Sequence, residues 1–151
     1  MTKEERMQKA GDLFMSGYNC CQSVFMAFAD KYGIDEETAL KISCSFGGGL
    51  SRLREVCGSV SGMALVCGME TGNTDAKNQA AKTANYAKMR ELAAKFEELH
   101  GSIVCRQLLG IEKKEESAAP SFRTGEYYKK RPCKELIMSA AGILAEEFEN
   151  Q

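Results

Sequence analysis

Apolar residues recur at helical spacing along most of this chain, in segments bounded by glycines and by capping side chains. The sequence has only two prolines, and it lacks the regularly spaced, alternating β-branched runs that are typical of sheet proteins. Its 151 residues suit one domain, and a hydrophobic content of 44% can supply a core. We therefore expect an all-α fold, a compact bundle of about six or seven helices that forms a single domain over residues 1–151.

Capping residues and glycines set the boundaries of the expected helices. Asn19 followed by Gln22 forms an approximate capping box, and Asp35 can cap the next helix. The expected helices run over Lys3–Met15, from Cys20 to a stop at Gly33, from Asp35 toward Phe46, from near Val56 to Met69, from Asn73 or Thr74 through Leu99 to a stop at Gly101, from Ser102 through Leu109 to a stop at Gly110, and from Pro132, in the first helical position, to Phe148. The inner face expected for the long helix consists of Ala76, Ala80, Ala87, Ala93, Phe96 and Leu99.

Residues 112–131 differ in character from the rest of the chain. They are highly charged, contain Pro120 and Gly125, and show no hydrophobic period. We expect a surface loop, which is long for a compact domain. Because Phe122, Tyr127 and Tyr128 stand among its charges, a docking strip for a partner is the alternative to a solvated loop.

Four cysteines each fall at the expected start of a helix, namely Cys20, Cys57, Cys105 and Cys133. The first turn of a helix offers unpaired N–H groups and the positive end of the helix dipole. Both stabilise a thiolate relative to a thiol, and the thiolate is the nucleophile and the metal ligand. Although these cysteines lie far apart in sequence, we expect them to share one site. Cys57 also follows Arg52 and Arg54, whose charge would lower its pKa further.

The other three cysteines are expected to be buried core residues: Cys21, Cys44 and Cys67. The start of the chain is charged and has no apolar segment of the secretory type, so seven cysteines indicate a reducing compartment. No Cys-x-x-Cys motif occurs, and the four helix-start cysteines lack the local spacing of zinc fingers or bacterial ferredoxins. A metal site would therefore have to be assembled by the tertiary fold. The single histidine, His100, fits a solvated or capping residue better than a ligand.

Glycines mark two further positions of interest. Three consecutive glycines at 47–49 suit a tight turn between helices or a nest of N–H groups that binds an anion, although no phosphate-loop ending follows them. Glycines 58 and 62 lie on one helix face, where they would let this helix cross the Cys20 helix closely or admit a small ligand to Cys57. The candidate cofactor-binding or close-approach positions are thus Gly47, Gly48, Gly49, Gly58 and Gly62.

Taken together, these segments resemble the redox-active family that is named for its C_GCAxxG_C_C pattern. The matching pieces are Gly17–Cys20, Phe46–Gly49, Cys57–Gly62, Cys105–Gly110 and Cys133, so that the resemblance spans nearly the whole chain. It implies four characteristic cysteines, which map to Cys20, Cys57, Cys105 and Cys133. Two positions depart from the pattern, since Ser59 and Cys21 stand where alanine is usual. Cys21 is then either an extra resolving thiol or a harmless substitution.

Charged residues are nearly balanced, with 20 Lys and Arg against 21 Asp and Glu. This balance argues against a general nucleic-acid surface, which is usually strongly basic. No apolar run reaches the ~18 residues of a membrane span. We therefore expect a cytoplasmic protein without a nucleic-acid or membrane partner, and a homodimer is compatible with its size.

Three functions fit these observations. The first is a redox protein, such as a thiol-dependent oxidoreductase, in which two or more of the four cysteines cycle between thiol and disulfide. Its thiolate, at Cys57 or Cys20, would attack a disulfide or peroxide from a redox partner or small-molecule oxidant. The second is a metal-binding protein that holds zinc or an iron–sulfur cluster on the same four thiolates. With a cluster, the protein would be an electron carrier. The third is a helical interaction module whose cysteines only fill the core.

Overall fold

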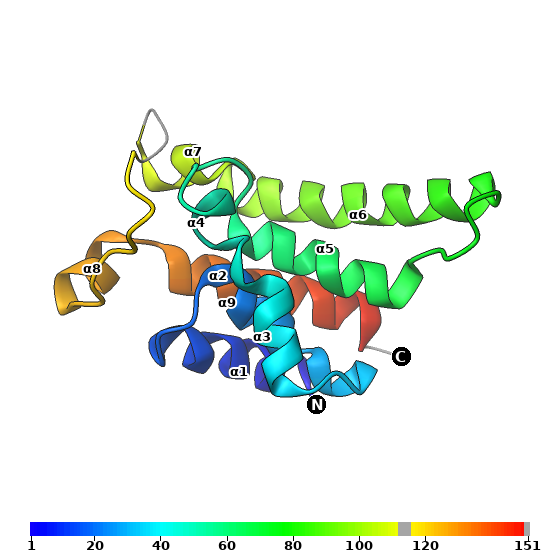
Figure 1. Cartoon of the computed structure of the whole chain (residues 1–151), viewed down its shortest axis with the longest axis horizontal. Helices are drawn as coiled ribbons and strands as arrows, with labels where there is room; N and C mark the ends of the chain where they lie inside the picture. Colours follow the sequence, from blue (N-terminus) through cyan, green and yellow to red (C-terminus); the bar gives the residue numbers. More distant parts are fainter. Residues whose placement is uncertain (112–115, 150–151) are drawn as a thin grey trace.

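The computed structural model describes residues 1–111 and 116–149, apart from the side chains of residues 129 and 130. Helices make up the regular structure of these ranges, which confirms the predicted all-α class (Figure 1). One isolated antiparallel bridge joins Val56 and Val104. The helices are α1 (Lys3–Met15), α2 (Cys20–Met26), the 3-10 helix η1 (Ala29–Tyr32), α3 (Glu36–Cys44), α4 (Gly47–Leu50), α5 (Gly58–Thr71), α6 (Gln79–His100), α7 (Cys105–Leu109), α8 (Gly125–Lys130) and α9 (Cys133–Phe148).

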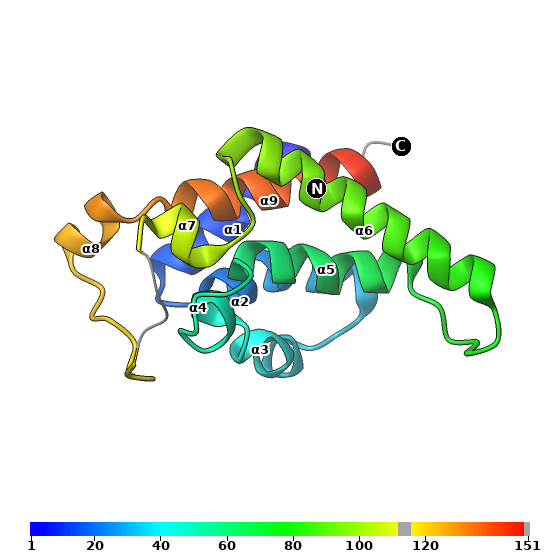
Figure 2. The same cartoon turned by 90° about the horizontal axis from the view of Figure 1, so that it is seen from above.

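Helices α5 and α9 lie at the centre of the packing. Helix α5 packs against α2, α6 and α9, while α9 also packs against α1. Figures 1 and 2 show α6 lying along one side of α5, and α1 on the far side of the molecule from α6. The largest fully buried side chains come from α1, α2, α5, α6, α9 and the turn after α2: Phe14, Phe25, Phe28, Met63, Phe96, Leu92, Ile137 and Leu144. No helix in the described ranges is long and apolar enough to cross a membrane.

Local capping signals account for several helix boundaries that the sequence predicts. Thr2 and Glu5 form a capping box at the start of α1, and Asn19 and Gln22 form the expected box at α2. The Asp35 side chain accepts a hydrogen bond from the Thr38 N–H and so begins α3. Gly33, Gly101 and Gly110 follow their helices with φ values of 65°, 89° and 72°, a left-handed region that glycine enters without strain.

The predicted start of α6 is wrong by several residues. The Asn73 side chain instead hydrogen-bonds the backbone of Asp75, which holds a turn, and Asn78 caps the helix at Gln79. The inner face is only partly as predicted, because Phe96 is buried and Ala93 is half-buried, but Leu99 is 64% exposed. The first turns of α6 extend beyond the end of α5 (Figures 1 and 2), and Ala80 on these turns and Ala76 in the turn before the helix are exposed. Ala87 is also exposed, although Asn85 of α6 already donates a hydrogen bond to Thr71 of α5.

Three shorter segments also differ from expectation. Ser102 forms a local turn by accepting a hydrogen bond from the Val104 N–H, so that α7 begins three residues later than Ser102. Pro132 is the N-cap of α9 rather than its first helical residue. Within the predicted loop 112–131, residues 112–115 lie outside the described residues, and Thr124 caps the short helix α8. This helix has no periodic apolar face and is held by aromatic contacts between Tyr127, Tyr128 and Phe14.

Candidate functional site

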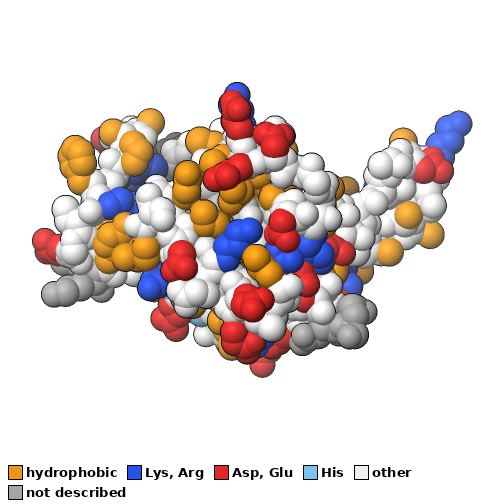
Figure 3. Space-filling view, turned by 90° about the horizontal axis from the view of Figure 1, so that it is seen from below, with side chains coloured by type: hydrophobic (Ala, Val, Ile, Leu, Met, Phe, Trp, Pro, Cys, Tyr) orange, Lys and Arg blue, Asp and Glu red, His pale blue; other side chains and the backbone are white. Residues whose placement is uncertain are grey.

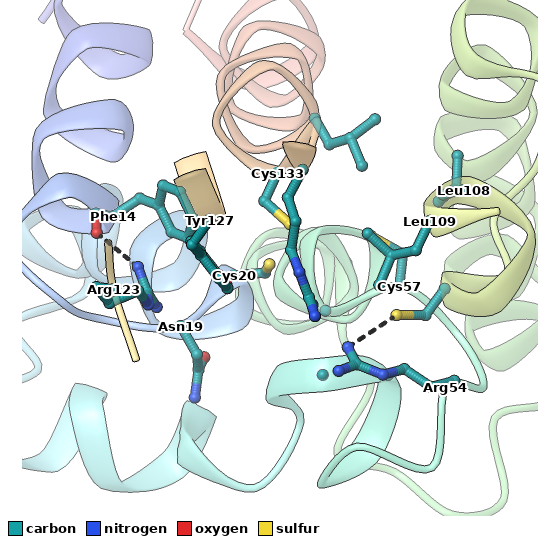
Figure 4. A pocket seen from close by; sticks show the side chains of 16 residues that line it. Phe14, Asn19, Cys20, Arg54, Cys57, Leu108, Leu109, Arg123, Tyr127 and Cys133 are labelled. Carbon is teal, nitrogen blue, oxygen red and sulfur yellow. Dashed lines mark hydrogen bonds between the residues drawn. The ribbon is translucent and has the colours of Figure 1, made fainter. Parts of the chain in front are cut away.

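The four cysteines at helix starts line one cavity of about 60 Å³ (Figure 4). Cys20, Cys105 and Cys133 are each the first residue of a helix, and Cys57 is the N-cap residue of α5. The prediction that these cysteines begin helices is therefore confirmed to within one residue. The fold also brings together side chains that sequence separates by tens of residues.

The position of Cys20 is fixed by the residue before it. The Asn19 side chain accepts a hydrogen bond from the Gln22 N–H, and its own amide donates to the Cys44 carbonyl at 2.9 Å. A Cβ added at Gly47 would stand 2.4 Å from Cγ of Asn19, so only glycine leaves room for this side chain. Asn19 thus caps α2 and ties its start to the end of α3.

Cys57 and Cys105 are held together by a short antiparallel pairing of their backbones. The Cys57 N–H donates to the Ile103 carbonyl at 2.8 Å, and the Cys105 N–H donates to the Glu55 carbonyl at 2.6 Å. The bridge between Val56 and Val104 lies between these two hydrogen bonds. The pairing places the starts of α5 and α7 side by side.

The glycine turn continues into an unusual left-handed segment. Positive φ angles occur at five consecutive residues: Gly48, Gly49, Leu50, Ser51 and Arg52. Arg54, at φ 60°, follows them. For residues other than glycine, this conformation costs about 1–2 kcal/mol each. Hydrogen bonds from the N–H groups of Arg54 and Glu55 to the carbonyls of Gly48 and Gly49 close the segment, and such local strain is most often found at functional sites.

Helices α2 and α5 cross closely at two glycines, as predicted. A Cβ at Gly58 would lie 3.0 Å from the Cys20 Cβ, and a Cβ at Gly62 would lie 2.8 Å from the Val24 Cβ. Of the five candidate glycines, Gly48, Gly49 and Gly58 line the cavity, whereas Gly62 faces Val24 and Gly47 faces Asn19. A cofactor-binding role for any of them stays a prediction.

Among the four cavity cysteines, Cys133 has the environment that most favours the thiolate form. Hydrogen bonding by the Cys20 side chain lowers the pKa of Cys133 to about 7, against the opposing effect of burial. The charges of Arg131, Arg123 and Arg54 lower this pKa further. The same interaction with Cys133, followed by burial, raises the pKa of Cys20 well above its ordinary value. The pair therefore favours one thiolate, on Cys133, and one thiol, on Cys20.

The other two thiols stay protonated near neutral pH. Burial raises the pKa of Cys57 to about 11, although hydrogen bonding by Ser59 opposes this shift. Burial also raises the pKa of Cys105, against the Arg54 guanidinium, whose Nη1 donates to the Cys105 Sγ at 3.7 Å. The expectation of a low-pKa thiolate at Cys57 or Cys20 is thus wrong, because the hydrogen bond with Cys133 and burial raise the pKa of Cys20, and burial raises that of Cys57.

Two side chains that line the cavity, Arg123 and Arg131, escaped the sequence analysis, and a third, Tyr127, was named there only as part of a possible docking strip. All lie in the segment 112–131, where we expected a solvated loop. Arg123 donates hydrogen bonds to the carbonyls of Phe14 and Tyr18 at 3.1 and 3.0 Å, which anchors the segment to the end of α1. The aromatic residues among the charges were the available signal, but no periodicity indicated which of them would turn inward.

The remaining cysteines divide into two kinds. Cys21 is buried, and burial raises its pKa to about 12, which makes it a core thiol and a poor nucleophile. Cys67 is also buried, as expected, and its Sγ lies 3.5 Å from the Thr71 Oγ1. Cys44 is exposed, contrary to expectation, because it is the last residue of α3 and the helix buries Ala39 and Ser43 instead.

Among the residues in the described ranges, no group of three or more His, Cys, Asp or Glu side chains is arranged to hold an ion. The four cysteines line one cavity without converging on one point. A tetrathiolate centre would therefore require these side chains to move.

The model of the family described as "Putative redox-active protein (C_GCAxxG_C_C)" matches residues 18–147, which include all four cavity cysteines. Neither a curated protein nor a solved structure gave a match. Since the matched segment covers most of the chain, the protein belongs to the C_GCAxxG_C_C family of redox-active proteins.

Proposed function

We propose that this protein exchanges thiols and disulfides, with Cys133 as the attacking thiolate and Cys20 as the resolving thiol. The observation that carries the proposal is that these two residues line one cavity together with Arg54, Arg123 and Arg131. The hydrogen bond between them lowers the pKa of Cys133 and raises that of Cys20. A thiol with a pKa near ambient pH is close to the optimum for attack on a disulfide. Cys133 alone among the four cavity cysteines meets this condition.

The exchange would proceed in two steps. In the first, the Cys133 thiolate attacks one sulfur of a disulfide, which breaks the S–S bond and releases one half as a thiolate. In the second, Cys20 loses its proton, attacks the Cys133 sulfur of the mixed disulfide, and releases the other half. The substrate gains two electrons, and the protein becomes the Cys20–Cys133 disulfide. One half of the substrate takes the proton of Cys20 and leaves as a thiol, while the other half leaves as a thiolate that takes a proton from water. A dithiol reductant then reduces this disulfide and returns the protein to its starting state.

The geometry around the pair supports this division of roles. Cys133 begins α9, a 16-residue helix, and arginines 54, 123 and 131 line the same cavity. Figure 4 shows Cys20 and Cys133 reaching the cavity from different helices. The proton released by Cys20 in the second step can pass to the departing thiolate, so the exchange needs no separate acid–base residue.

The test is to trap the mixed disulfide. Reduced Cys20→Ser protein treated with bis(2-hydroxyethyl) disulfide should accumulate a mixed disulfide on Cys133, identified by mass spectrometry of acid-quenched peptides. The unsubstituted protein should instead form a Cys20–Cys133 disulfide, as should the control Cys67→Ser. Modification that falls first on Cys57 or Cys105 would overturn the assignment.

Metal binding by the same thiols is a second candidate, favoured by the collection of four cysteines around one cavity. Zinc or an iron–sulfur cluster would fit the donor type. Elemental analysis of protein purified without oxygen tests it. A stoichiometric metal that is lost in Cys133→Ser would establish a metal site, and a metal content near zero would contradict one.

We also infer that the protein works in a reducing compartment such as the cytoplasm. All seven cysteines are free, and an exchange site of this kind must be returned to the dithiol state. Retention of free thiols in protein isolated from cells under acid quenching would support this location. Quantitative oxidation of the pair in such samples would contradict it.

A further inference from the structure

We propose that the substrate of this site is a small disulfide that carries carboxylate groups, held by Arg123 and Arg131 while its sulfur meets Cys133. This inference rests on the proposed thiol–disulfide exchange and narrows its substrate class. It is supported by a second hollow next to the thiol cavity, which we call the arginine vestibule.

The arginine vestibule has a volume of about 320 Å³ and shares part of its wall with the thiol cavity. The shared residues are Asn19, Gly48, Arg54, Arg123, Tyr127 and Arg131. Its size falls in the range of small-molecule sites, whereas the thiol cavity of about 60 Å³ has room for little more than a sulfur and its neighbouring carbon. The two together fit a small molecule whose polar end stays in the vestibule.

The lining of the vestibule is strongly basic. Four arginines contribute to it: Arg52, Arg54, Arg123 and Arg131. None of the described residues that line it is Asp or Glu. The face of the molecule in Figure 3, by contrast, carries acidic and basic side chains interspersed, and the formal net charge of the chain is −1. The basic lining of the vestibule thus contrasts with the mixed charges of that face and with the near balance of charge in the whole chain.

Arg123 is rigidly held by groups that leave its charge intact. It donates to two backbone carbonyls, and its guanidinium carbon lies 4.4 Å from the Phe14 ring centroid and 5.1 Å from that of Tyr127. The guanidinium carbon of Arg131 lies 4.9 Å from the centroid of the same Tyr127 ring. Carbonyls and aromatic rings orient a guanidinium without neutralising it. Both arginines are half-buried, so that their charge acts where screening by water is reduced.

Carboxylates are the anions that this arrangement suits best in a disulfide substrate. A guanidinium presents a planar fork that can donate two parallel hydrogen bonds to a carboxylate. With a carboxylate on Arg123 or Arg131, the disulfide of a short-chain molecule can reach the adjoining cavity. The Cys133 thiolate then forms a bond to the nearer sulfur, the S–S bond breaks, and the farther sulfur leaves as a thiolate; Cys20 completes the two-electron reduction as above.

The experiment compares three short disulfides of similar size and different charge. These are 3,3′-dithiodipropionate with two negative charges, bis(2-hydroxyethyl) disulfide with none, and cystamine with two positive charges. The rate constant for oxidation of the reduced protein is measured for each disulfide at pH 7 and low ionic strength. It is divided by the rate constant for reaction of the same disulfide with a simple monothiol, which corrects for the intrinsic reactivity of the disulfide. We expect the dianion to exceed the neutral probe by roughly tenfold, with cystamine slowest.

Variants separate binding of the anion from activation of the thiol. Arg123→Gln and Arg131→Gln lower the charge around Cys133 and so reduce its thiolate fraction, which slows all three probes alike. The dianion-to-neutral ratio cancels that effect, and we expect it to fall at least threefold in each variant. Arg90→Gln, an exposed arginine on α6, is the matched control and should leave the ratio unchanged.

The outcomes distinguish this inference from the function on which it rests. Equal corrected rates for all three probes, with Cys133 still oxidised, would overturn the anionic substrate and leave thiol–disulfide exchange standing. A preference for the dianion that survives both arginine variants would also overturn the assignment to Arg123 and Arg131. Failure of every probe to oxidise the Cys20–Cys133 pair would remove the proposed function itself.

Discussion

Gly49 lies directly against Cys105: a Cβ added to the glycine would stand 2.6 Å from the Cys105 Cβ. The backbone of Glu55 and Arg54 would lie within 2.9 Å of the same atom. Since Gly49 also has a φ of 65°, it meets both requirements that favour glycine, a left-handed backbone and a close approach. The wall of the thiol cavity therefore depends on the absence of a single side chain.

Gly49→Ala should destabilise the protein by about 2–4 kcal/mol, because it adds a steric clash to a strained backbone. The free energy of unfolding is measured by urea denaturation. Gly110→Ala is the matched control, since Gly110 has a similar φ of 72° but nothing within 4 Å of an added Cβ. The control should lose only about 1 kcal/mol. Equal losses for the two variants would show that the contact with Cys105 carries no cost.

Cys20→Ala should raise the pKa of Cys133 from about 7 toward the ordinary thiol value, because it removes the largest cause of the lowering. The pH dependence of Cys133 alkylation by iodoacetamide, followed by mass spectrometry, measures this pKa. At pH 7 the variant should react several-fold more slowly than the unsubstituted protein. Cys67→Ala should leave the Cys133 profile where it was. A midpoint that stays near 7 in Cys20→Ala would assign the lowering to the arginines instead.

Cys57 should make stability fall at alkaline pH. Burial raises its folded-state pKa to about 11, above the value of about 8.5 in an unfolded chain. A thiol with a raised pKa contributes stability below the unfolded pKa and loses it as pH rises through the folded pKa. The unfolding free energy of the unsubstituted protein minus that of Cys57→Ser should thus decrease between about pH 8.5 and 11. A difference that is constant or grows over this range would show that the folded state does not disfavour the Cys57 thiolate.

Gly62→Ala should cost about 1–3 kcal/mol, because the new methyl group would meet Val24 at 2.8 Å and force α2 and α5 apart. Urea denaturation again gives the value. Gly68→Ala, in the same helix and with nothing within 4 Å, is the control. It should be neutral or stabilise the protein by up to about 1 kcal/mol, as alanine favours helix. Similar stability in the two variants would mean that the crossing tolerates a wider gap.

Local signals made part of the fold predictable. Asn19 with Gln22, Asp35, and Gly101 each act on the backbone within a few residues, so their effects can be read from adjacent positions. The four cysteines were selected for the same reason, since each stands beside a helix start. Helix α6 shows the limit of such signals, because the exposure of Ala80 depends on where α5 ends beside it.

The decisive features of the candidate site are not local. The pairing of Glu55 and Cys57 with Ile103 and Cys105 joins two segments with no alternating strand pattern. Arg123 reaches the cavity through bonds to carbonyls of α1 and the turn after it, and its own neighbours in sequence do not indicate this. The pKa order of the thiols depends on burial and on the Cys20–Cys133 contact, which outweigh the helix ends that the sequence displays.

The environment that favours the Cys133 thiolate has a consequence for the reduction potential of any disulfide that includes this residue. Forming the disulfide discharges the thiolate and gives up its stabilisation by Cys20 and the three arginines. That loss disfavours the oxidised state relative to the dithiol, which makes the disulfide more oxidising than one formed from ordinary thiols. The same charges that prepare Cys133 for attack therefore stabilise the dithiol form of the protein. Only a disulfide that is sufficiently oxidising will then convert the protein to its own disulfide.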